Sequence, residues 1–196
     1  MEYLNIVLIS IFIGPASLKE DSKSRTQLLS RFGGKYCYCI DSLFGNMTSK
    51  KIIAVFGATG AQGGSVARAM LEGKKYVVRA LTQDVTQPKV QVLRDLGAEV
   101  VKGDLNDKAS VEAALKGAYG AFLVTNTWDH FSKEKEVCQG KVVADVAKSQ
   151  GLKHVVYSGL ENVKRLTNGK LEVLHFDGKG EVEEYFWSIG VPMTSV

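Results

Sequence analysis

Short runs rich in apolar and β-branched residues alternate with amphipathic segments along the chain from Lys50 onward. The apolar runs predict strands at 51–56, 76–81, 99–102, 121–124, 154–158 and 192–196. The amphipathic segments predict helices at 62–72, 89–96, 108–116, 132–150 and 171–189. A glycine follows each predicted helix, where a left-handed residue commonly ends one: Gly73, Gly97, Gly117, Gly151 and Gly190. Because such alternation is typical of parallel sheets covered on both faces, we expect a doubly wound α/β fold.

The first 46 residues lack this pattern. Their apolar run, 6–13, is too short for a bilayer, which needs about twenty residues, so no membrane association is expected. A secretory signal peptide is an alternative, although the start MEYLN carries no Lys or Arg. We expect 1–46 to be a leader outside the fold and 47–196 to form the domain. Since the chain stops at its last predicted strand, we expect the domain to be incomplete, with a smaller second domain truncated.

Charge and cysteine content exclude several classes of protein. The 25 basic and 21 acidic residues are spread along the chain without a basic block, so direct nucleic-acid binding is not expected. Three cysteines, at 37, 39 and 138, provide neither a disulfide framework nor a zinc site. We therefore expect a reducing compartment and no metal.

A glycine-rich string, Gly57-Ala-Thr-Gly60-Ala-Gln-Gly63, joins the first predicted strand to the first predicted helix. In this position Gly57 allows a tight exit from the strand and Gly60 allows backbone to approach a pyrophosphate. Gly63 lets the helix pack closely on the sheet, and the N–H groups at the helix start face the anion. The string predicts a dinucleotide site in a Rossmann-type domain.

The end of the second predicted strand bears on the choice between NAD and NADP. An acidic residue there pairs with the ribose hydroxyls, whereas an Arg accepts the 2′-phosphate. This chain has the neutral residues Thr82 and Gln83, followed by Asp84. These residues leave the choice between NADP(H) and NAD(H) open.

Four motifs in order, GATGAQGGSVARAML, KGDLNDKASVEAALKGAYGAFLVTN, VVYSGLENV and HFDGKGEVEEYF, resemble the NmrA-like family. This family is an atypical branch of the short-chain dehydrogenases. The resemblance implies NADP(H) as cofactor and a regulatory role in which cofactor state changes the binding of a protein partner. Some members are reductases, which leaves reduction of quinones or small carbonyls as the alternative. The resemblance also implies a location in the cytoplasm and the nucleus, and leaves a homodimer open.

Matched by motif, the resemblance assigns the cofactor to specific residues. The pyrophosphate is assigned to Gly57, Thr59, Gly60, Ala61, Gln62 and Gly63. The adenosine ribose is assigned to Thr82 and Gln83, although the family usually has Arg at the second position. Asp104 and Leu105 are expected to flank the adenine, and Thr125 and Asn126 to lie along the nicotinamide half.

The catalytic residues depart from the pattern of short-chain dehydrogenases. These enzymes use Tyr-x-x-x-Lys on the fifth helix, and this chain has His175 and Lys179 at that spacing. His175 is a candidate acid or an ordinary surface residue, and Gly178 and Gly180 are expected to leave room for a ligand beside Lys179. Ser158 is a third candidate, because it ends the fifth predicted strand at the ligand-binding edge. The missing Tyr favours a regulator over an enzyme.

Overall fold

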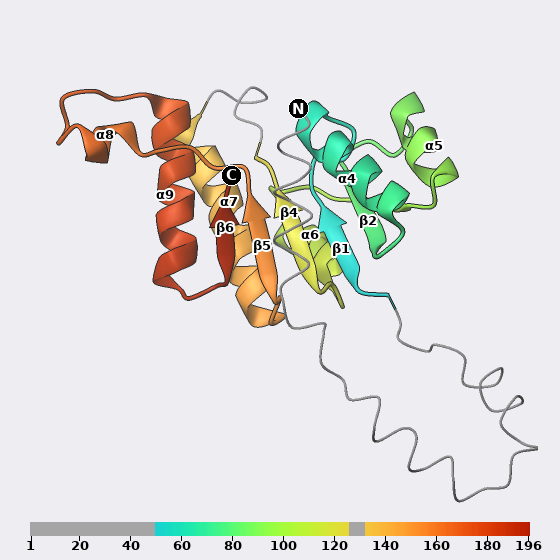
Figure 1. Cartoon of the computed structure of the whole chain (residues 1–196). Coiled ribbons are helices and arrows are strands. Elements are labelled where there is room, and N and C mark those ends of the chain that lie inside the picture. Colours follow the sequence, from blue (N-terminus) through green and yellow to red (C-terminus); the bar gives the residue numbers. More distant parts are fainter. Residues whose placement is uncertain (1–49, 126–131) are drawn as a thin grey trace, which may run out of the picture.

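The computed structural model describes residues 50–125 and 132–196; the predicted leader and Asn126 lie outside these ranges. Six parallel strands form one sheet in the order β3-β2-β1-β4-β5-β6 (Figure 1). The strands are β1 (Ile52–Val55), β2 (Val77–Thr82), β3 (Glu99–Lys102), β4 (Gly120–Leu123), β5 (His154–Tyr157) and β6 (Met193–Ser195). Strand order reverses between β1 and β4, which creates the crevice where open α/β sheets bind ligands. The predicted doubly wound fold is confirmed.

Within the described residues, six helices connect the strands. They are α4 (Ala61–Gly73), α5 (Pro88–Asp95), α6 (Lys108–Leu115), α7 (Lys133–Ser149), α8 (Val163–Leu166) and α9 (Leu174–Ser188). The sequence did not predict α8, because a single turn has no apolar period to detect. Helix α9 begins later than predicted, since the N–H of Leu171 donates to Thr167 Oγ1 and places Leu171 in the preceding loop. None of the described helices is long and apolar enough to cross a membrane.

The two faces of the sheet bury alternate residues of each strand. On β1, Ile53 and Val55 pack against α4 and α5, whereas Ala54 belongs to the core shared with α6, α7 and α9. Figure 1 shows α4 and α5 on one side of the sheet and α6 and α7 on the other. All three of these β1 side chains have no exposed surface. The centre of β1 is therefore buried on both faces and cannot meet a ligand, which is left to the strand ends, the loops and the helices beside them.

Four of the five predicted helix-ending glycines have the left-handed conformation. Gly97, Gly117, Gly151 and Gly190 have φ between 66° and 94°. Gly73 was predicted wrongly, because it is the last residue of α4 and Lys74, with φ of 53°, takes the left-handed position. The N–H of Lys74 donates to the Leu71 carbonyl there, which stabilises the turn without a glycine.

Candidate functional site: a cleft at the carboxyl ends of the strands

The glycine loop leads from β1 directly into α4. Gly57 has φ of +61°, a conformation that an L side chain rarely adopts. A Cβ at Gly63 would collide with the carbonyl oxygens of Phe56 and Gly57, so only glycine lets the helix start this close to the strand. Gly60 caps α4 without a side-chain hydrogen bond, and the first turn holds no acidic residue. The positive end of α4 is therefore left for an anion.

A cleft of about 1370 Å³ opens beside this loop. Its volume is above the roughly 300–1,000 Å³ of ordinary small-molecule sites, which suits an extended ligand. The cleft is lined by thirteen of the predicted site residues, namely Gly57, Thr59, Gly60, Ala61, Gln62, Gly63, Thr82, Gln83, Leu105, Thr125, Ser158, His175 and Lys179. Asp104 is not among its lining residues, and Asn126 lies outside the described residues. In the described part of the chain, no cluster of His, Cys, Asp and Glu is arranged to hold a metal ion.

At the end of β2, Thr82 and Gln83 differ in their exposure to solvent. Thr82 is buried, and its hydroxyl donates to the Asp84 carbonyl at 3.2 Å. Gln83 is exposed and lines the cleft. The Asp84 carboxylate accepts hydrogen bonds from the side chain and backbone of Thr86, which lower the pKa of Asp84. Asp84 thus stabilises its own turn, and of the two predicted residues that line the cleft Gln83 is the exposed one.

The loop after β3 brings one of its two predicted residues, Leu105, to the cleft, together with Asn106, which was not predicted. The Asp104 carboxylate accepts from the backbone and the side-chain N–H of Asn106, both at 2.9 Å. It therefore holds the turn, while Leu105 and Asn106 line the cleft. Gln139 of α7 donates to Asn106 Oδ1 at 3.0 Å, which ties this loop to α7.

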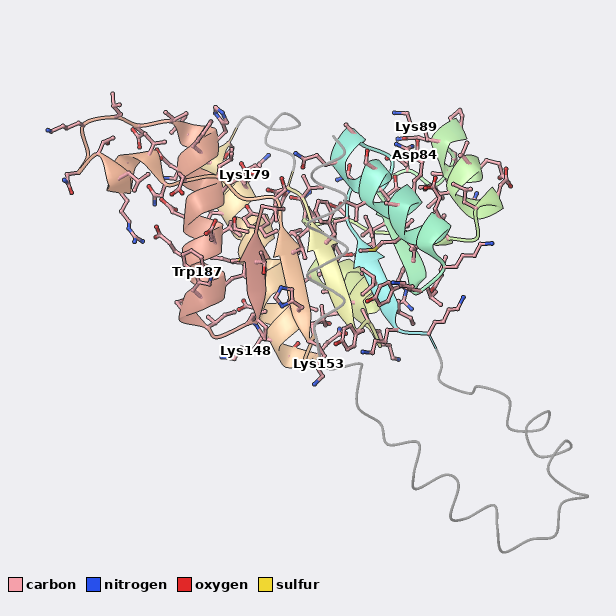
Figure 2. All side chains as sticks on the ribbon, viewed as in Figure 1. Asp84, Lys89, Lys148, Lys153, Lys179 and Trp187 are labelled. Carbon is pink, nitrogen blue, oxygen red and sulfur yellow. The ribbon has the colours of Figure 1, made fainter. Side chains whose placement is uncertain are left out.

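Two cations beside the glycine loop were not predicted. Arg68 on α4 and Lys89 on α5 line a smaller cavity of about 250 Å³ together with Thr59 and Gly60. Lys89 Nζ donates to the Thr59 carbonyl at 3.3 Å, so the ammonium lies next to the loop. Figure 2 shows Lys89 and Lys179 at the edge to which the strands point, on opposite sides of the sheet's centre. The sequence carries no signal for these two cations, because their proximity to the loop depends on how α5 packs beside α4.

Lys179 lies at the inner end of the cleft and is 9% exposed. Its ammonium lies 2.9 Å from Thr125 Oγ1 and 3.2 Å from Glu136 Oε1. The carbonyl oxygens of Thr125 and Ser158 each lie at 3.3 Å. Four acceptors thus surround a group with three protons. Burial lowers the pKa of Lys179, and the Glu136 carboxylate opposes this shift.

Glu136 is the main site residue that sequence reasoning missed. It has no exposed surface although it lies in a strongly charged segment, KEKEV, at the start of α7. Its Oε1 accepts a hydrogen bond of 2.6 Å from the Thr125 hydroxyl, which in turn accepts from Lys179. Helical spacing places Glu136 on the same face of α7 as Gly140 and Val143, which was the available signal for its burial. Its pairing with Lys179 could not be predicted, because it depends on how α7 packs against α9.

The remaining catalytic candidates line the same cleft. The Ser158 hydroxyl donates to Gln62 Oε1 at 2.8 Å and so joins the end of β5 to the first turn of α4. His175 lies one helical turn before Lys179, and its ring contacts Phe176 edge to face. Tyr157 has its phenol oxygen 3.5 Å from Thr125 Oγ1, but the residue is fully buried. Burial raises the pKa of Tyr157, so this phenol is a poor acid.

The glycines beside Lys179 do not leave room for a ligand, contrary to the prediction. A Cβ at Gly180 would lie 2.6 Å from the backbone nitrogen of Asn162, and one at Gly178 would lie 3.3 Å from Lys133 Cγ. The space beside α9 is therefore filled by α7 and by the segment that leads into α8. These glycines allow close packing of the protein around Lys179.

Comparison with known proteins places this architecture in a family. The profile of the NmrA-like family matches residues 49–196. An NmrA-like family domain-containing oxidoreductase of Malbranchea aurantiaca, malD, is 40% identical over 144 residues, covering 70% of this chain and 43% of that protein. This chain therefore spans less than half the length of that relative.

Solved structures of NmrA, a negative transcriptional regulator, show the same fold. Its complex with NADP has a TM-score of 0.64 and 27% identity, covering 76% of this chain and 45% of that one. Its complex with NAD has a TM-score of 0.66 and 28% identity, with the same coverage. With the family profile matched over most of its length and its sheet shared with NmrA, this chain belongs to the NmrA-like family.

Proposed function

We propose that this chain binds NADP(H) in the cleft and acts as a redox-responsive regulator, whose affinity for a protein partner changes with cofactor state. The glycine loop supports cofactor binding, since the uncapped end of α4 lies at the crevice between β1 and β4. Lys89 supports a phosphorylated ligand because its ammonium lies beside the loop. The related NmrA binds both NADP and NAD, which supports the same ligand class here.

Different residues along the cleft bind different parts of the cofactor. Backbone N–H groups at the start of α4, from Ala61 to Gly63, hold the pyrophosphate. Gln83 meets the adenosine ribose, and Lys179 stands at the nicotinamide end. A bound nicotinamide supplies or accepts a hydride. An acid that donates a proton to a substrate must lie within reach of the same end of the cleft.

The hydrogen bonds and the ion pair of Lys179 are the observation that favours a regulator over a reductase. Its ammonium is engaged by oxygens of Thr125, Ser158 and Glu136. The phenol near it, that of Tyr157, is buried and has a raised pKa. The short-chain dehydrogenase arrangement of a reachable phenol activated by a free Lys is therefore not reproduced on α9, where His175 replaces the Tyr.

A reductase of quinones or small carbonyls is the second candidate. Ser158 and His175 line the cleft together with Lys179, so a hydroxyl and an imidazole are available near the nicotinamide end. Relatives such as malD are named oxidoreductases, which also supports this candidate. In this function His175 would supply the proton, because histidine is the side chain that most often acts as a general acid.

Two measurements separate the candidates. Calorimetry with NADPH, NADP⁺ and NAD⁺ tests binding, and absorbance of NADPH in the presence of a panel of quinones and carbonyls tests turnover. In a regulator, the reduced and oxidised cofactors must differ in how strongly they favour one protein conformation over another. Without such a difference, a change of cofactor state would not shift the equilibrium between the conformations. We expect NADPH and NADP⁺ to give different hydrogen-exchange patterns in α9 without turnover. Identical patterns together with steady oxidation of NADPH would favour the reductase.

A further inference from the structure

Helices α7 and α9 approach each other unusually closely beside the cleft. Gly140 on α7 faces Val182 on α9, and a Cβ at position 140 would collide with the valine side chain. Glu136 lies one turn before Gly140, and Lys179 lies one turn before Val182. Since the helices touch at the glycine, side chains one turn away are forced together. The close contact therefore brings the carboxylate and the ammonium to 3.2 Å.

The pair is buried and tied to the ends of two strands. Glu136 has no exposed surface and Lys179 is 9% exposed, so neither charge is well solvated. Thr125, which follows β4, donates to Glu136 Oε1 and accepts from Lys179. The Ser158 carbonyl, which follows β5, accepts from the same ammonium. Lys179 is thereby held in one position at the end of the cleft.

Burial of a lysine disfavours its charged form, and a carboxylate in contact restores it. Glu136 of α7 contacts the Lys179 ammonium, and the ring centre of Tyr157 lies 5.6 Å from it. His175 and Glu183 lie one helical turn before and after Lys179 on α9. Lys135 also lines the cleft, but a positively charged side chain does not stabilise the charged form of Lys179. Among these groups, the Glu136 carboxylate is the one in direct contact with the Lys179 ammonium, whereas the Glu183 carboxylate accepts a hydrogen bond from Ser195.

We propose that Glu136 is a positioning residue, which keeps Lys179 protonated and fixed in place so that the cleft presents a cation to the cofactor. The proposal rests on the proposed binding of NADP(H). Glu136 acts through Lys179 and does not itself line the cleft. The cation contributes to cofactor affinity only while it is protonated, so loss of Glu136 is expected to create a pH dependence.

The main test is Glu136→Gln in the full chain, with NADPH affinity measured by calorimetry from about pH 7 to about pH 9.5, below the ordinary lysine pKa of about 10.4. We expect the unmodified protein to bind almost equally across this range. We expect the variant to lose about tenfold in affinity as pH rises, because Lys179 loses its proton without the carboxylate. The matched control is Glu134→Gln, which changes an exposed glutamate in the same helical turn and should leave the profile flat. A flat profile for Glu136→Gln would overturn the proposal.

A second series covers the case in which Glu136→Gln does not fold, since breaking a buried pair leaves an uncompensated charge. Lys179→Met and the double variant Glu136→Gln/Lys179→Met remove the cation alone or both charges. If Glu136 acts only through Lys179, the two variants bind NADPH with equal affinity. A further loss in the double variant would show that Glu136 acts independently, and would overturn the proposal.

A third readout needs no cofactor and so separates this proposal from the proposed function. Titration of the Lys179 side-chain nitrogen, followed by ¹⁵N NMR, should move to lower pH in Glu136→Gln. Burial disfavours the charged form of Lys179, and the variant lacks the carboxylate that opposes this effect. If the unmodified protein fails to bind NADPH, the proposed function is wrong. The titration still tests the role of Glu136, because it does not depend on the cofactor. An unchanged Lys179 titration in the variant would overturn that role.

Discussion

Gly140 on α7 packs directly against Val182 on α9, with no space for a β-carbon between them. We expect Gly140→Ala to lower the free energy of unfolding by about 1–3 kcal/mol, because overpacking a tight contact forces side chains and backbone to shift. Denaturant unfolding measures this change. The matched control is Gly73→Ala in α4, where a Cβ meets no atom within 4 Å. Alanine there should raise stability by up to about 1 kcal/mol through helix propensity. A stabilising Gly140→Ala would contradict the packing described.

Backbone access at Gly60 is expected to govern cofactor binding. We predict that Gly60→Val abolishes dinucleotide binding and leaves the sheet folded. Gly60 is exposed and has φ of −83°, which valine can adopt, but its side chain would stand where the pyrophosphate meets the end of α4. Calorimetry with NADPH and circular dichroism of the same sample measure the two effects. Undiminished NADPH affinity in a folded variant would remove the basis for placing the pyrophosphate here.

Gln83 is expected to weaken the choice of NADP over NAD. We predict that Gln83→Arg tightens NADP binding by about tenfold and leaves NAD almost unchanged, because arginine makes a charge-assisted fork with a phosphate. The control is Gln91→Arg, which adds the same charge on the exposed side of α5. Competition between NADP and NAD measures the preference. Equal tightening of both cofactors would show that position 83 does not contact the 2′-phosphate.

Substitutions at His175 test whether the protein reduces carbonyl compounds. His175→Tyr restores the Tyr-x-x-x-Lys spacing on α9, and we predict that it changes NADPH affinity by about twofold or less. Any carbonyl reduction it confers should be faint, since Lys179 is engaged by Glu136 and Thr125. Turnover is followed by loss of NADPH absorbance. Robust turnover in the unmodified protein that disappears in His175→Ala would make His175 the acid and favour the reductase.

Asp177 should make the region around α8 sensitive to acid. Desolvation alone raises the pKa of this buried carboxyl, but hydrogen bonds from the N–H groups of Lys164 and Val173 outweigh it, and its pKa is lowered. A carboxyl whose pKa is lowered by folding stabilises the protein above its unfolded pKa and loses that effect as pH falls. We predict that Asp177→Asn costs about 1–3 kcal/mol near pH 7 and progressively less in acid. Urea unfolding at several pH values checks this, and a pH-independent difference would contradict it.

The alternation of strands and helices was readable from the sequence because it depends on local periodicity. The parallel strands lie where apolar runs predicted them, within one residue at each end. The glycine loop was equally readable, since Gly57 and Gly63 meet backbone constraints imposed by their immediate neighbours. The short α8 and the left-handed Lys74 were not readable, because each depends on a single turn and not on a repeating pattern.

The environment of Lys179 was decided by tertiary structure alone. Its partner Glu136 is 43 positions earlier in the chain, by the difference of their numbers, and no local spacing in the sequence relates the two residues. Only the approach of α7 to α9 buries this carboxylate and brings it to the ammonium. Charge, burial and distance at such a site depend on the packing of helices that are remote in sequence. Local sequence specified the elements that frame the cleft, and long-range packing specified the electrostatics at its inner end.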